Sequence, residues 1–173
     1  MAWGPVCHVV TGPAGAGKSV YAGQLALTLR ACVIDSDVAT ERLIRAGLGL
    51  AGRDADDRDS AEYKRVFRDA VYETMFDLAA ANLRQVSVVL AGPFTREGGD
   101  AHWPEWLRKR LGVMPVMHFV WCPPEVRRVR LATRGEPRDG PKLASWEAYA
   151  GTCREDRPVW PHTFEDTTAV TGV

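Results

Sequence analysis

The sequence of 173 residues lacks any excess of charge, because its 22 lysine and arginine side chains equal its 22 aspartate and glutamate side chains. Without a basic or acidic surplus there is no global reason to expect nucleic acid or an acidic membrane surface as a partner. The sequence also lacks an apolar run of the ~18 residues that a membrane span requires, and a charged amino-terminal region followed by an apolar core. We therefore expect a soluble, cytoplasmic protein with neither a nucleic-acid nor a membrane partner.

Paired cysteines are missing as well. The sequence has four cysteines but no C-x-x-C pair, and Cys7, Cys32 and Cys122 fall in or beside strand-like segments. We expect these three and Cys153 to be small apolar side chains of a reducing compartment, with metal ligation or disulfides as the alternative. Internal repeats and low-complexity tracts are also lacking, and the length fits a single domain over residues 1–173.

A glycine-rich motif is present near the start of the sequence. Residues 12–19 read GPAGAGKS and fit the Walker A pattern G-x-x-x-x-G-K-[ST] at every fixed position. A strand-like run precedes the motif and a helix-like stretch at 20–30 follows it, and this context disfavours a chance match in a glycine-rich turn. Glycines let backbone N–H groups turn inward around a phosphate, and the helix N-terminus adds positive potential.

The motif predicts a nucleotide site in which its lysine and its serine have distinct tasks. Lys18 is expected to reach the β- and γ-phosphates, and the Ser19 hydroxyl is expected to bind Mg²⁺. The residues expected to contact the nucleotide are Gly12, Pro13, Ala14, Gly15, Ala16, Gly17, Lys18, Ser19 and Val20.

Strand-like and helix-like segments alternate along the chain, which predicts a parallel sheet wrapped by helices. The predicted strands are the run before the glycine-rich motif, 31–34, 86–91, 116–122 and, at an edge, 164–170. The predicted helices are 20–30, 38–46, 60–84, 103–111, 125–134 and 143–153. Segment 47–59 is rich in Gly, Ala and Asp without apolar periodicity, which predicts a loop or a mobile flap.

Two carboxylates, Asp35 and Asp37, follow the predicted second strand. Ligands of open α/β sheets bind beyond the carboxyl ends of the strands, so both should lie near the glycine-rich loop. One carboxylate can hold Mg²⁺ while the other accepts a proton from, or orients, an acceptor hydroxyl. We assign Asp35 to the metal and Asp37 as the base, and the residue types leave the opposite assignment open. The structural alternative for Asp37 is a helix N-cap, which is compatible with catalysis.

Arginines are concentrated in the helix predicted at 125–134. Arg127, Arg130 and Arg134 are spaced i, i+3, i+7, which puts three guanidinium groups on one helical face. A basic turn punctuated by Gly and Pro follows at 135–142. This arrangement predicts an Arg-rich lid over polyphosphate at about 127–142, and a solvated helix face is the alternative.

The glycine-rich motif together with the stretch from Val33 to Glu41 resembles the first third of shikimate kinase. The same stretch is similar to dephospho-CoA kinase and to the small P-loop kinases that include gluconate kinase, chloramphenicol phosphotransferase and the zeta-type toxins. The resemblance implies a nucleoside-monophosphate-kinase-like fold. This fold is a three-layer P-loop NTPase α/β sandwich with a five-stranded parallel sheet in the order 2-3-1-4-5, helices on both faces and a lid. The resemblance also implies that Arg130 and Arg134 contact the γ-phosphate of ATP.

The sequence departs from shikimate kinases after the third predicted strand. Those enzymes have three consecutive glycines there, whereas this chain has GPF at 92–94, and their carboxylate-binding arginine has only an offset counterpart, Arg68. Shikimate is therefore not expected as the acceptor. A Walker-B aspartate is also missing after this strand, which leaves Asp35 as the carboxylate for the metal. The candidates for acceptor contacts, each with packing or solvation as the alternative, are Arg68, Phe94, Arg96 and Trp103.

These features predict an ATP-dependent, Mg²⁺-requiring phosphotransferase that moves the γ-phosphoryl group to a hydroxyl of a small-molecule acceptor, as a monomer or homodimer. Its catalytic residues would be Asp37, Lys18, Arg130 and Arg134, acting by positioning and charge neutralisation. A toxin- or resistance-type kinase acting on a nucleotide-sugar or an antibiotic would share this chemistry and differ in the acceptor pocket. A GTP-dependent switch is disfavoured because the sequence lacks the guanine-reading motif Asn-Lys-x-Asp, and an oligomeric ATPase is disfavoured because it lacks a Walker-B carboxylate. A non-catalytic nucleotide-binding module is disfavoured by the presence of the lysine, the serine and both aspartates.

Overall fold

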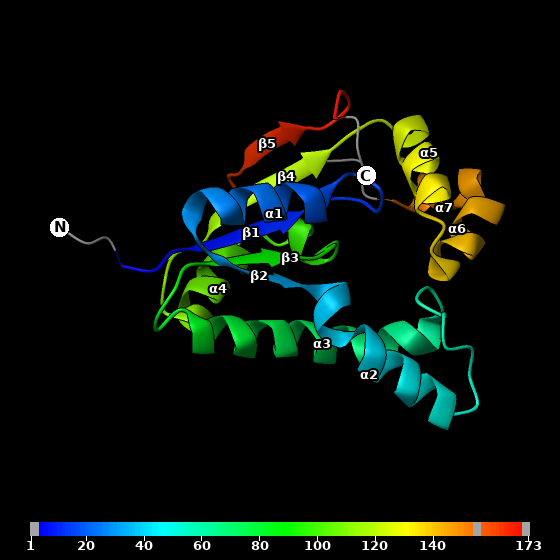
Figure 1. Cartoon of the computed structure of the whole chain (residues 1–173), viewed down its shortest axis with the longest axis horizontal. Coiled ribbons are helices and arrows are strands. Elements are labelled where there is room, and N and C mark those ends of the chain that lie inside the picture. Colours follow the sequence, from blue (N-terminus) through cyan, green and yellow to red (C-terminus); the bar gives the residue numbers. More distant parts are fainter. Residues whose placement is uncertain (1–3, 154–156, 171–173) are drawn as a thin grey trace.

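The computed structural model describes residues 4–153 and 157–170. Its core is one sheet of five parallel strands in the order β2-β3-β1-β4-β5, as predicted (Figure 1). The strands are β1 (Cys7–Thr11), β2 (Cys32–Asp35), β3 (Val88–Ala91), β4 (Val116–Trp121) and β5 (Thr163–Asp166). Val9 of β1 is paired with Leu90 of β3 on one side and with Met117 of β4 on the other. The loop that leaves β1 therefore begins at the centre of the carboxyl edge of the sheet.

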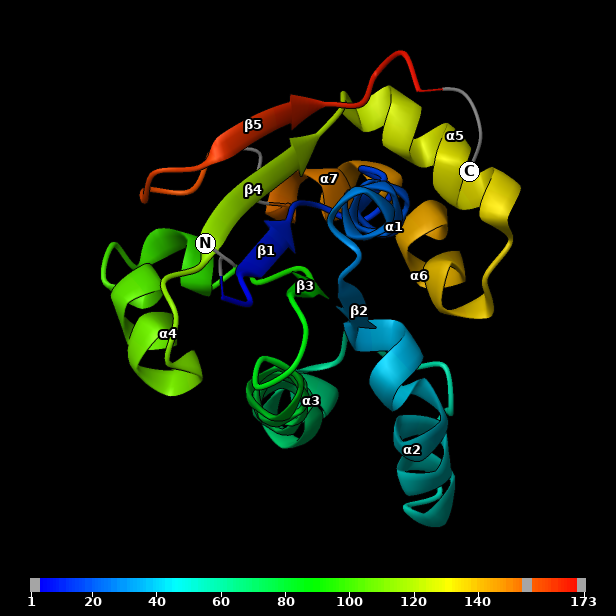
Figure 2. The same ribbon diagram turned by 60° about the vertical axis from the view of Figure 1, so that its left-hand side comes forward.

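Helices cover both faces of this sheet, which makes three layers (Figure 2). The five longer helices are α1 (Lys18–Leu29), α2 (Ser36–Leu50), α3 (Ala61–Asn82), α4 (Trp103–Leu111) and α5 (Pro124–Arg134). On one face, Ala22 and Ala26 of α1 pack with Val10 of β1. On the other face, Met75 of α3 and Leu107 of α4 belong to the larger apolar cluster. Burial on both faces explains why the strands read as continuous apolar runs in the sequence.

Helix α2 is longer than predicted, so the expectation of a loop over the whole of 47–59 is wrong. Residues 47–50 continue the helix because Thr40, Ile44 and Leu48 form a buried stripe at i, i+4 spacing. Tertiary packing of this stripe outweighs the low helix propensity of the glycines. The following loop ends at Ser60, whose hydroxyl accepts a hydrogen bond of 3.0 Å from the Tyr63 N–H as the N-cap of α3.

The region after β4 also differs in detail from the prediction. Helix α5 begins with Pro124 at its first position, where the missing N–H of proline carries no penalty. A 3₁₀ turn, η2 (Pro137–Asp139), and two short helices follow, α6 (Gly140–Ala144) and α7 (Trp146–Thr152). The single helix expected at 143–153 is wrong, because Ser145 interrupts it with φ −128° and ψ 50°. Figure 1 shows α5, α6 and α7 grouped beyond the carboxyl ends of the strands.

Cys7 and Cys122 are buried, and Cys32 and Cys153 are half-buried, all as free thiols. Among residues 4–153 and 157–170, no helix combines the length and the apolar character that crossing a membrane demands.

Candidate functional site

The glycine-rich loop joins β1 to α1 in a conformation that glycine alone permits. Gly12, Gly15 and Gly17 have φ values of 149°, 79° and 91°. A Cβ at Gly12 would overlap the carbonyl oxygen of Val120 on β4, so any other residue would push β1 away from its neighbour. Gly17 is the left-handed N-cap of α1, and the unpaired N–H groups of the first helical turn follow it directly. The loop and the helix end together form an anion-binding arrangement.

A cavity of about 770 Å³ opens at the carboxyl end of the sheet, next to this loop. Its walls are the glycine-rich loop, the start of α2, the first half of α3, the loop after β3 and the segment from α5 to α7. Nine cationic and four carboxylate side chains line it: Lys18, Arg58, Lys64, Arg68, Arg96, Arg130, Arg134, Arg138 and Lys142, with Asp35, Asp37, Asp59 and Asp139. Because the chain as a whole has no net charge, this concentration of cations favours an anionic ligand in the cavity.

Ser19 and Asp35 meet in this cavity. The Ser19 hydroxyl donates a hydrogen bond of 2.7 Å to Oδ2 of Asp35. The other carboxylate oxygen, Oδ1, accepts hydrogen bonds from the backbone N–H groups of Asp37 (2.9 Å) and Val38 (3.4 Å). Asp35 is therefore the N-cap of α2, and the alternative that gave this role to Asp37 is wrong because the helix already begins at Ser36. A hydroxyl and a carboxylate oxygen side by side fit the ligand preference of Mg²⁺.

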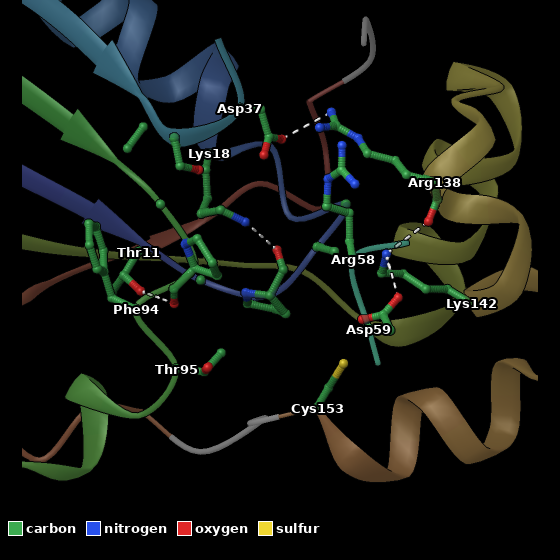
Figure 3. Close-up of a pocket in the computed structure, with 18 of the residues that line it drawn as sticks. Thr11, Lys18, Asp37, Arg58, Asp59, Phe94, Thr95, Arg138, Lys142 and Cys153 are labelled. Atoms are coloured by element: carbon green, nitrogen blue, oxygen red, sulfur yellow. Dashed lines mark hydrogen bonds and ion pairs between the residues drawn. The ribbon is translucent and has the colours of Figure 1, made fainter. Parts of the chain in front are cut away.

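Lys18 reaches into the cavity from the first position of α1 (Figure 3). Its Nζ donates a hydrogen bond of 2.8 Å to the carbonyl oxygen of Pro13. Burial lowers the pKa of this ammonium group to about 8, against the opposing effect of the nearby Asp37 and Asp35 carboxylates. A buried cation bound to a neutral carbonyl gains strongly from an anionic partner such as phosphate.

Asp37 lies in the first turn of α2, and its carboxylate is half-exposed to the cavity. Its Oδ2 atom lies 3.0 Å from Nη2 of Arg138, which comes from the opposite wall (Figure 3). Burial raises the pKa of Asp37, and the neighbouring Asp35 and Glu41 carboxylates add to this rise, while Arg138 and Lys18 oppose it. A carboxylate with a raised pKa beside a phosphate loop is suited to accept a proton.

Arg130 lines the cavity and holds the segment after β5. Its Nη1 donates to Oγ1 of Thr167 at 3.0 Å, and its Nη2 donates to the carbonyl oxygens of Thr167 at 2.6 Å and Val170 at 2.9 Å. Thr167 in turn donates a hydrogen bond of 2.7 Å to the carbonyl oxygen of Ala16 in the glycine-rich loop. Arg130 therefore links α5, the end of β5 and the loop.

The other two arginines of α5 have different surroundings. Arg134 lines the cavity, and its Nε donates a hydrogen bond of 3.0 Å to Oδ2 of Asp139. Arg127 is fully buried, with its guanidinium 5.8 Å from the centre of the Trp146 ring, and it is not among the described residues that line the cavity. Of the predicted arginine face, Arg130 and Arg134 reach the site and Arg127 packs beneath α7.

Arg68 and Arg96 lie on the side of the cavity farther along α3. Arg68 donates from Nη2 to Oγ1 of Thr95 at 3.0 Å and lies 3.6 Å from the buried carboxylate of Glu97, in the 3₁₀ turn η1 (Glu97–Gly99). Arg96 carries an exposed guanidinium that lies 2.9 Å from Oδ1 of Asp69. Both arginines line the cavity, and both already have acidic partners.

Phe94 and Trp103 are packing residues. Phe94 is 1% exposed, and its ring centre lies 4.9 Å from that of Tyr72 and 5.1 Å from that of Trp103. A Cβ at Gly92 would lie 3.0 Å from the Phe94 ring, so glycine is needed for this ring to fold back over the loop. Phe94 lines the floor of the cavity, whereas Trp103 is not among its described lining residues. The expectation that Trp103 contacts an acceptor is wrong.

Four cavity cations were not predicted as site residues: Arg58, Lys64, Arg138 and Lys142. Arg58 donates to Oε1 of Glu41 at 2.8 Å, and Nζ of Lys142 lies 3.0 Å from Oδ2 of Asp59. Arg138 and Lys142 belong to the basic turn that the sequence marks as a lid. Arg58 lies in the acidic loop before α3, where the composition carries no signal for a buried cation.

Comparison with known proteins gives one family. A family model described as "AAA domain" matches residues 7–155. The chain is similar to the crystal structure of a candidate kinase from Chloroflexus aurantiacus, with 19% identity, a TM-score of 0.67 and coverage of 96% of this chain and 90% of that one. The comparison with curated proteins gives no match.

Two further solved structures show the same fold. A gluconokinase from Sinorhizobium meliloti is 15% identical with a TM-score of 0.56, over 94% of this chain and 82% of that one. A sugar kinase from Janibacter sp. is 16% identical with a TM-score of 0.58, over 94% of this chain and 85% of that one. These likenesses agree with the P-loop fold built from the five-stranded sheet.

Proposed function

Because the chain belongs to the AAA domain family of P-loop proteins, we propose that it is an ATP-dependent kinase that moves the γ-phosphoryl group to a hydroxyl of a small-molecule acceptor. The observation that carries this proposal is the convergence of Lys18, the Ser19–Asp35 pair and Asp37 on one cavity at the glycine-rich loop. Each supplies a group that phosphoryl transfer requires: a cation for the phosphates, oxygen ligands for a metal, and a carboxylate for the acceptor hydroxyl.

The glycine-rich loop and Lys18 bind the phosphates of the nucleotide in this proposal. The N–H groups of the loop and of the first turn of α1 donate to phosphate oxygens. The Lys18 ammonium exchanges the carbonyl of Pro13, now 2.8 Å away, for the β- and γ-phosphates. Charge-assisted hydrogen bonds to phosphate are stronger than a bond to a neutral carbonyl, so this exchange favours binding.

Ser19 and Asp35 are the residues that would hold Mg²⁺. Their direct hydrogen bond of 2.7 Å shows that both oxygens reach the same point, beside the loop. When bound, the ion neutralises charge on the phosphate oxygens. Asp35 meets this role while it caps α2, because the two tasks use different oxygen atoms.

Asp37 acts as the base and receives the proton of the acceptor hydroxyl as the new O–P bond forms. Its position in the first turn of α2 places it beside Lys18, so an acceptor hydroxyl bound to it lies near the nucleotide phosphates. We assign Arg134 to the charge that develops on the transferring group. Arg130 is assigned to the nucleotide, because its hydrogen bonds to Thr167 tie it to the segment after β5.

The acceptor occupies the half of the cavity between α3, the loop after β3 and α7. Arg68 and Thr95 offer it a cation and a hydroxyl, Arg96 lies at the rim, and Phe94 forms the floor. The structural likeness to a gluconokinase and a sugar kinase makes polyhydroxylated acceptors the first to test. We propose that the enzyme is soluble and cytoplasmic and that it acts on such a metabolite as a monomer or homodimer.

The test is ADP release from Mg-ATP with a panel of sugars, sugar acids, nucleosides, nucleotide-sugars and antibiotics. Asp37→Asn and Lys18→Ala are compared with Arg128→Gln, which removes an exposed cation on α5. The proposal expects one acceptor to stimulate release, with a loss of about 10²–10⁴-fold in Asp37→Asn and no loss in Arg128→Gln. Stimulation that survives in Asp37→Asn would refute the role of this carboxylate.

A further inference from the structure

Two cations lie one helical turn apart on the part of α3 that borders the cavity. They are Lys64 and Arg68, and both belong to the lining residues. Lys64 is exposed to solvent, and within residues 4–153 and 157–170 it forms no ion pair with a carboxylate. Like charges four residues apart on a helix repel each other and destabilise the helix. A negatively charged ligand between the two side chains would offset this repulsion.

Arg68 is held in place by the loop after β3 and by α3 itself. Its Nη2 atom donates a hydrogen bond of 3.0 Å to Oγ1 of Thr95 and lies 3.6 Å from Oε2 of Glu97. Its guanidinium carbon lies 5.9 Å from the centre of the Tyr72 ring. Glu97 is 7% exposed and is not among the described residues that line the cavity, so it supports Arg68 from within the wall. The guanidinium is therefore positioned before a ligand arrives, which lowers the entropy cost of binding.

The carboxylates on this wall do not neutralise its cations. Glu97 also lies 3.1 Å from Nη2 of Arg96, so one buried carboxylate is shared by two guanidinium groups. The second partner of Arg96 is Asp69, whose side chain is exposed. Three cations, Lys64 included, thus face two carboxylates. The buried Nε atom of Arg68 has no hydrogen-bond partner in the part of the chain that the structure describes. This wall therefore keeps an excess of positive charge, and the protein does not saturate the donors of Arg68.

We propose that the phosphoryl acceptor carries an oxyanion, either a carboxylate or a phosphate, and that Lys64 and Arg68 bind it. This inference rests on the proposed function, in which Lys18, Arg130 and Arg134 serve the nucleotide and the transferring group. The cations of α3 then remain for the acceptor. The planar guanidinium offers two parallel hydrogen bonds to a carboxylate or a phosphate, and the ammonium group adds a point charge on a flexible stem.

The same arrangement orients the acceptor. Asp37 lies at the start of α2, whereas Thr95, the partner of Arg68, lies in the loop after β3, on a different wall of the cavity (Figure 3). An acceptor whose oxyanion is bound at Arg68 therefore crosses the cavity to bring a hydroxyl to Asp37. The oxyanion and the reacting hydroxyl must lie at separate positions of the acceptor molecule. A neutral polyol of the same size lacks the first of these contacts and should bind more weakly.

The direct test follows the ¹⁵N–¹H signal of the Arg68 Nε group by NMR, with Arg68→Lys used to assign it. The nucleotide half is filled with Mg²⁺ and the non-hydrolysable analogue AMP-PNP, and the probes are D-gluconate, glucose 6-phosphate and D-glucose. We expect the signal to move with gluconate, with glucose 6-phosphate or with both, which tells a carboxylate from a phosphate, and not to move with glucose.

The matched variants of this titration lie on the same helix. Lys64→Gln should weaken the binding of the anionic probe by about 5–10-fold. The control Arg65→Gln removes an exposed cation that is not among the described lining residues, and it should bind like the wild type. Because Lys64 is exposed, its replacement leaves the core intact. An equal response to glucose and to the anions, no response to either anion, or unchanged binding in Lys64→Gln would overturn the inference.

A kinetic measurement separates this inference from the proposed function. With the acceptor that most stimulates ADP release, Lys64→Gln should raise the acceptor KM by about 5–10-fold and leave kcat and the KM for ATP nearly unchanged, as expected when only ground-state binding is lost. An uncharged best acceptor, with an unchanged KM in Lys64→Gln, would sink the anionic class and leave the kinase proposal intact. If the anions move the Arg68 signal but no compound of the panel stimulates ADP release, the anion site stands and the kinase proposal fails.

Discussion

Replacing Asp35 should separate two tasks that one carboxylate performs. Its Oδ1 atom accepts the N–H hydrogen bonds that cap α2, and its Oδ2 atom accepts the Ser19 hydroxyl at the expected metal position. Asp35→Ala removes both tasks. Asp35→Asn keeps an oxygen for the cap, but it turns an NH₂ group toward Ser19 in place of Oδ2 and loses the negative charge. The comparison of the two variants therefore separates the cap of α2, which only Asp35→Ala loses, from the charged metal ligand, which both variants lose.

The magnitudes follow from the contacts. Loss of an N-cap side chain costs about 0.5–2 kcal/mol, and the hydrogen bond from Ser19 adds about 1 kcal/mol. Asp35→Ala should thus lower the free energy of unfolding by about 2 kcal/mol, or the melting temperature by about 4–8 °C for a domain of this size. Asparagine is an equally good N-cap, so Asp35→Asn should lose only the interaction of the charge with the helix dipole, about 0.5 kcal/mol.

The assay has a stability arm and a binding arm. Urea unfolding measures the free energies, and titration calorimetry measures ATP affinity with Mg²⁺ and with a chelator. Both variants should lose about 10–100-fold of the Mg²⁺-dependent gain in affinity, and they should resemble the wild type when the metal is absent. If Asp35→Asn keeps the full Mg²⁺ dependence, Asp35 does not hold the metal. If Asp35→Ala unfolds like the wild type, the cap contributes nothing.

Three further predictions concern the loop and the core. Burial lowers the pKa of Lys18 to about 8, so Lys18 loses its positive charge as the pH rises through about 8. ATP affinity measured by calorimetry should weaken over this range, and an affinity that stays constant would contradict this account. Gly12→Ala should lower the free energy of unfolding by about 2 kcal/mol or more, because Gly12 has a φ of 149° and a Cβ there would overlap β4. Gly23→Ala, in open space on α1, should raise the melting temperature slightly. Equal melting temperatures of the two variants in a thermal melt would refute the packing argument. Burial and the adjacent His8 lower the pKa of His118 from 6.5 to about 4, so the unfolded state binds more protons than the folded state between these pH values. Urea unfolding should therefore show the free energy of unfolding falling by up to about 3 kcal/mol as the pH drops from 6.5 to 4. The same pH dependence in His118→Asn would show that another group is responsible.

The topology was readable from the sequence because local patterns encode it. Continuous apolar runs and amphipathic spacing set the alternation of strands and helices, and the glycine-rich motif fixed the first crossover. The strand order 2-3-1-4-5 came from the resemblance carried by this motif and by Asp35-x-Asp37, and it is confirmed. Helix boundaries were less accurate where packing opposes propensity, as at residues 47–50, whose helix is sustained by the buried Leu48.

Contacts across the cavity could not be read in this way. The pairs of Arg138 with Asp37 and Glu41 join residues about a hundred positions apart, and no periodicity links them. The N-cap alternative fell on Asp37 because the pattern could not resolve a shift of two residues in the start of α2. The sequence could not place Trp103 either, because an aromatic side chain at the start of a helix has the same appearance whether it faces a cavity or the core.

The central claim is that this chain transfers a phosphoryl group rather than hydrolysing ATP. The most direct measurement is ³¹P NMR of a reaction of Mg-ATP with the acceptor that most stimulates ADP release, in the wild type and in Asp37→Asn. The account predicts a new phosphomonoester signal that grows in step with ADP in the wild type and is lost in Asp37→Asn. A reaction that yields only ADP and inorganic phosphate, at the same rate in both proteins, would contradict it.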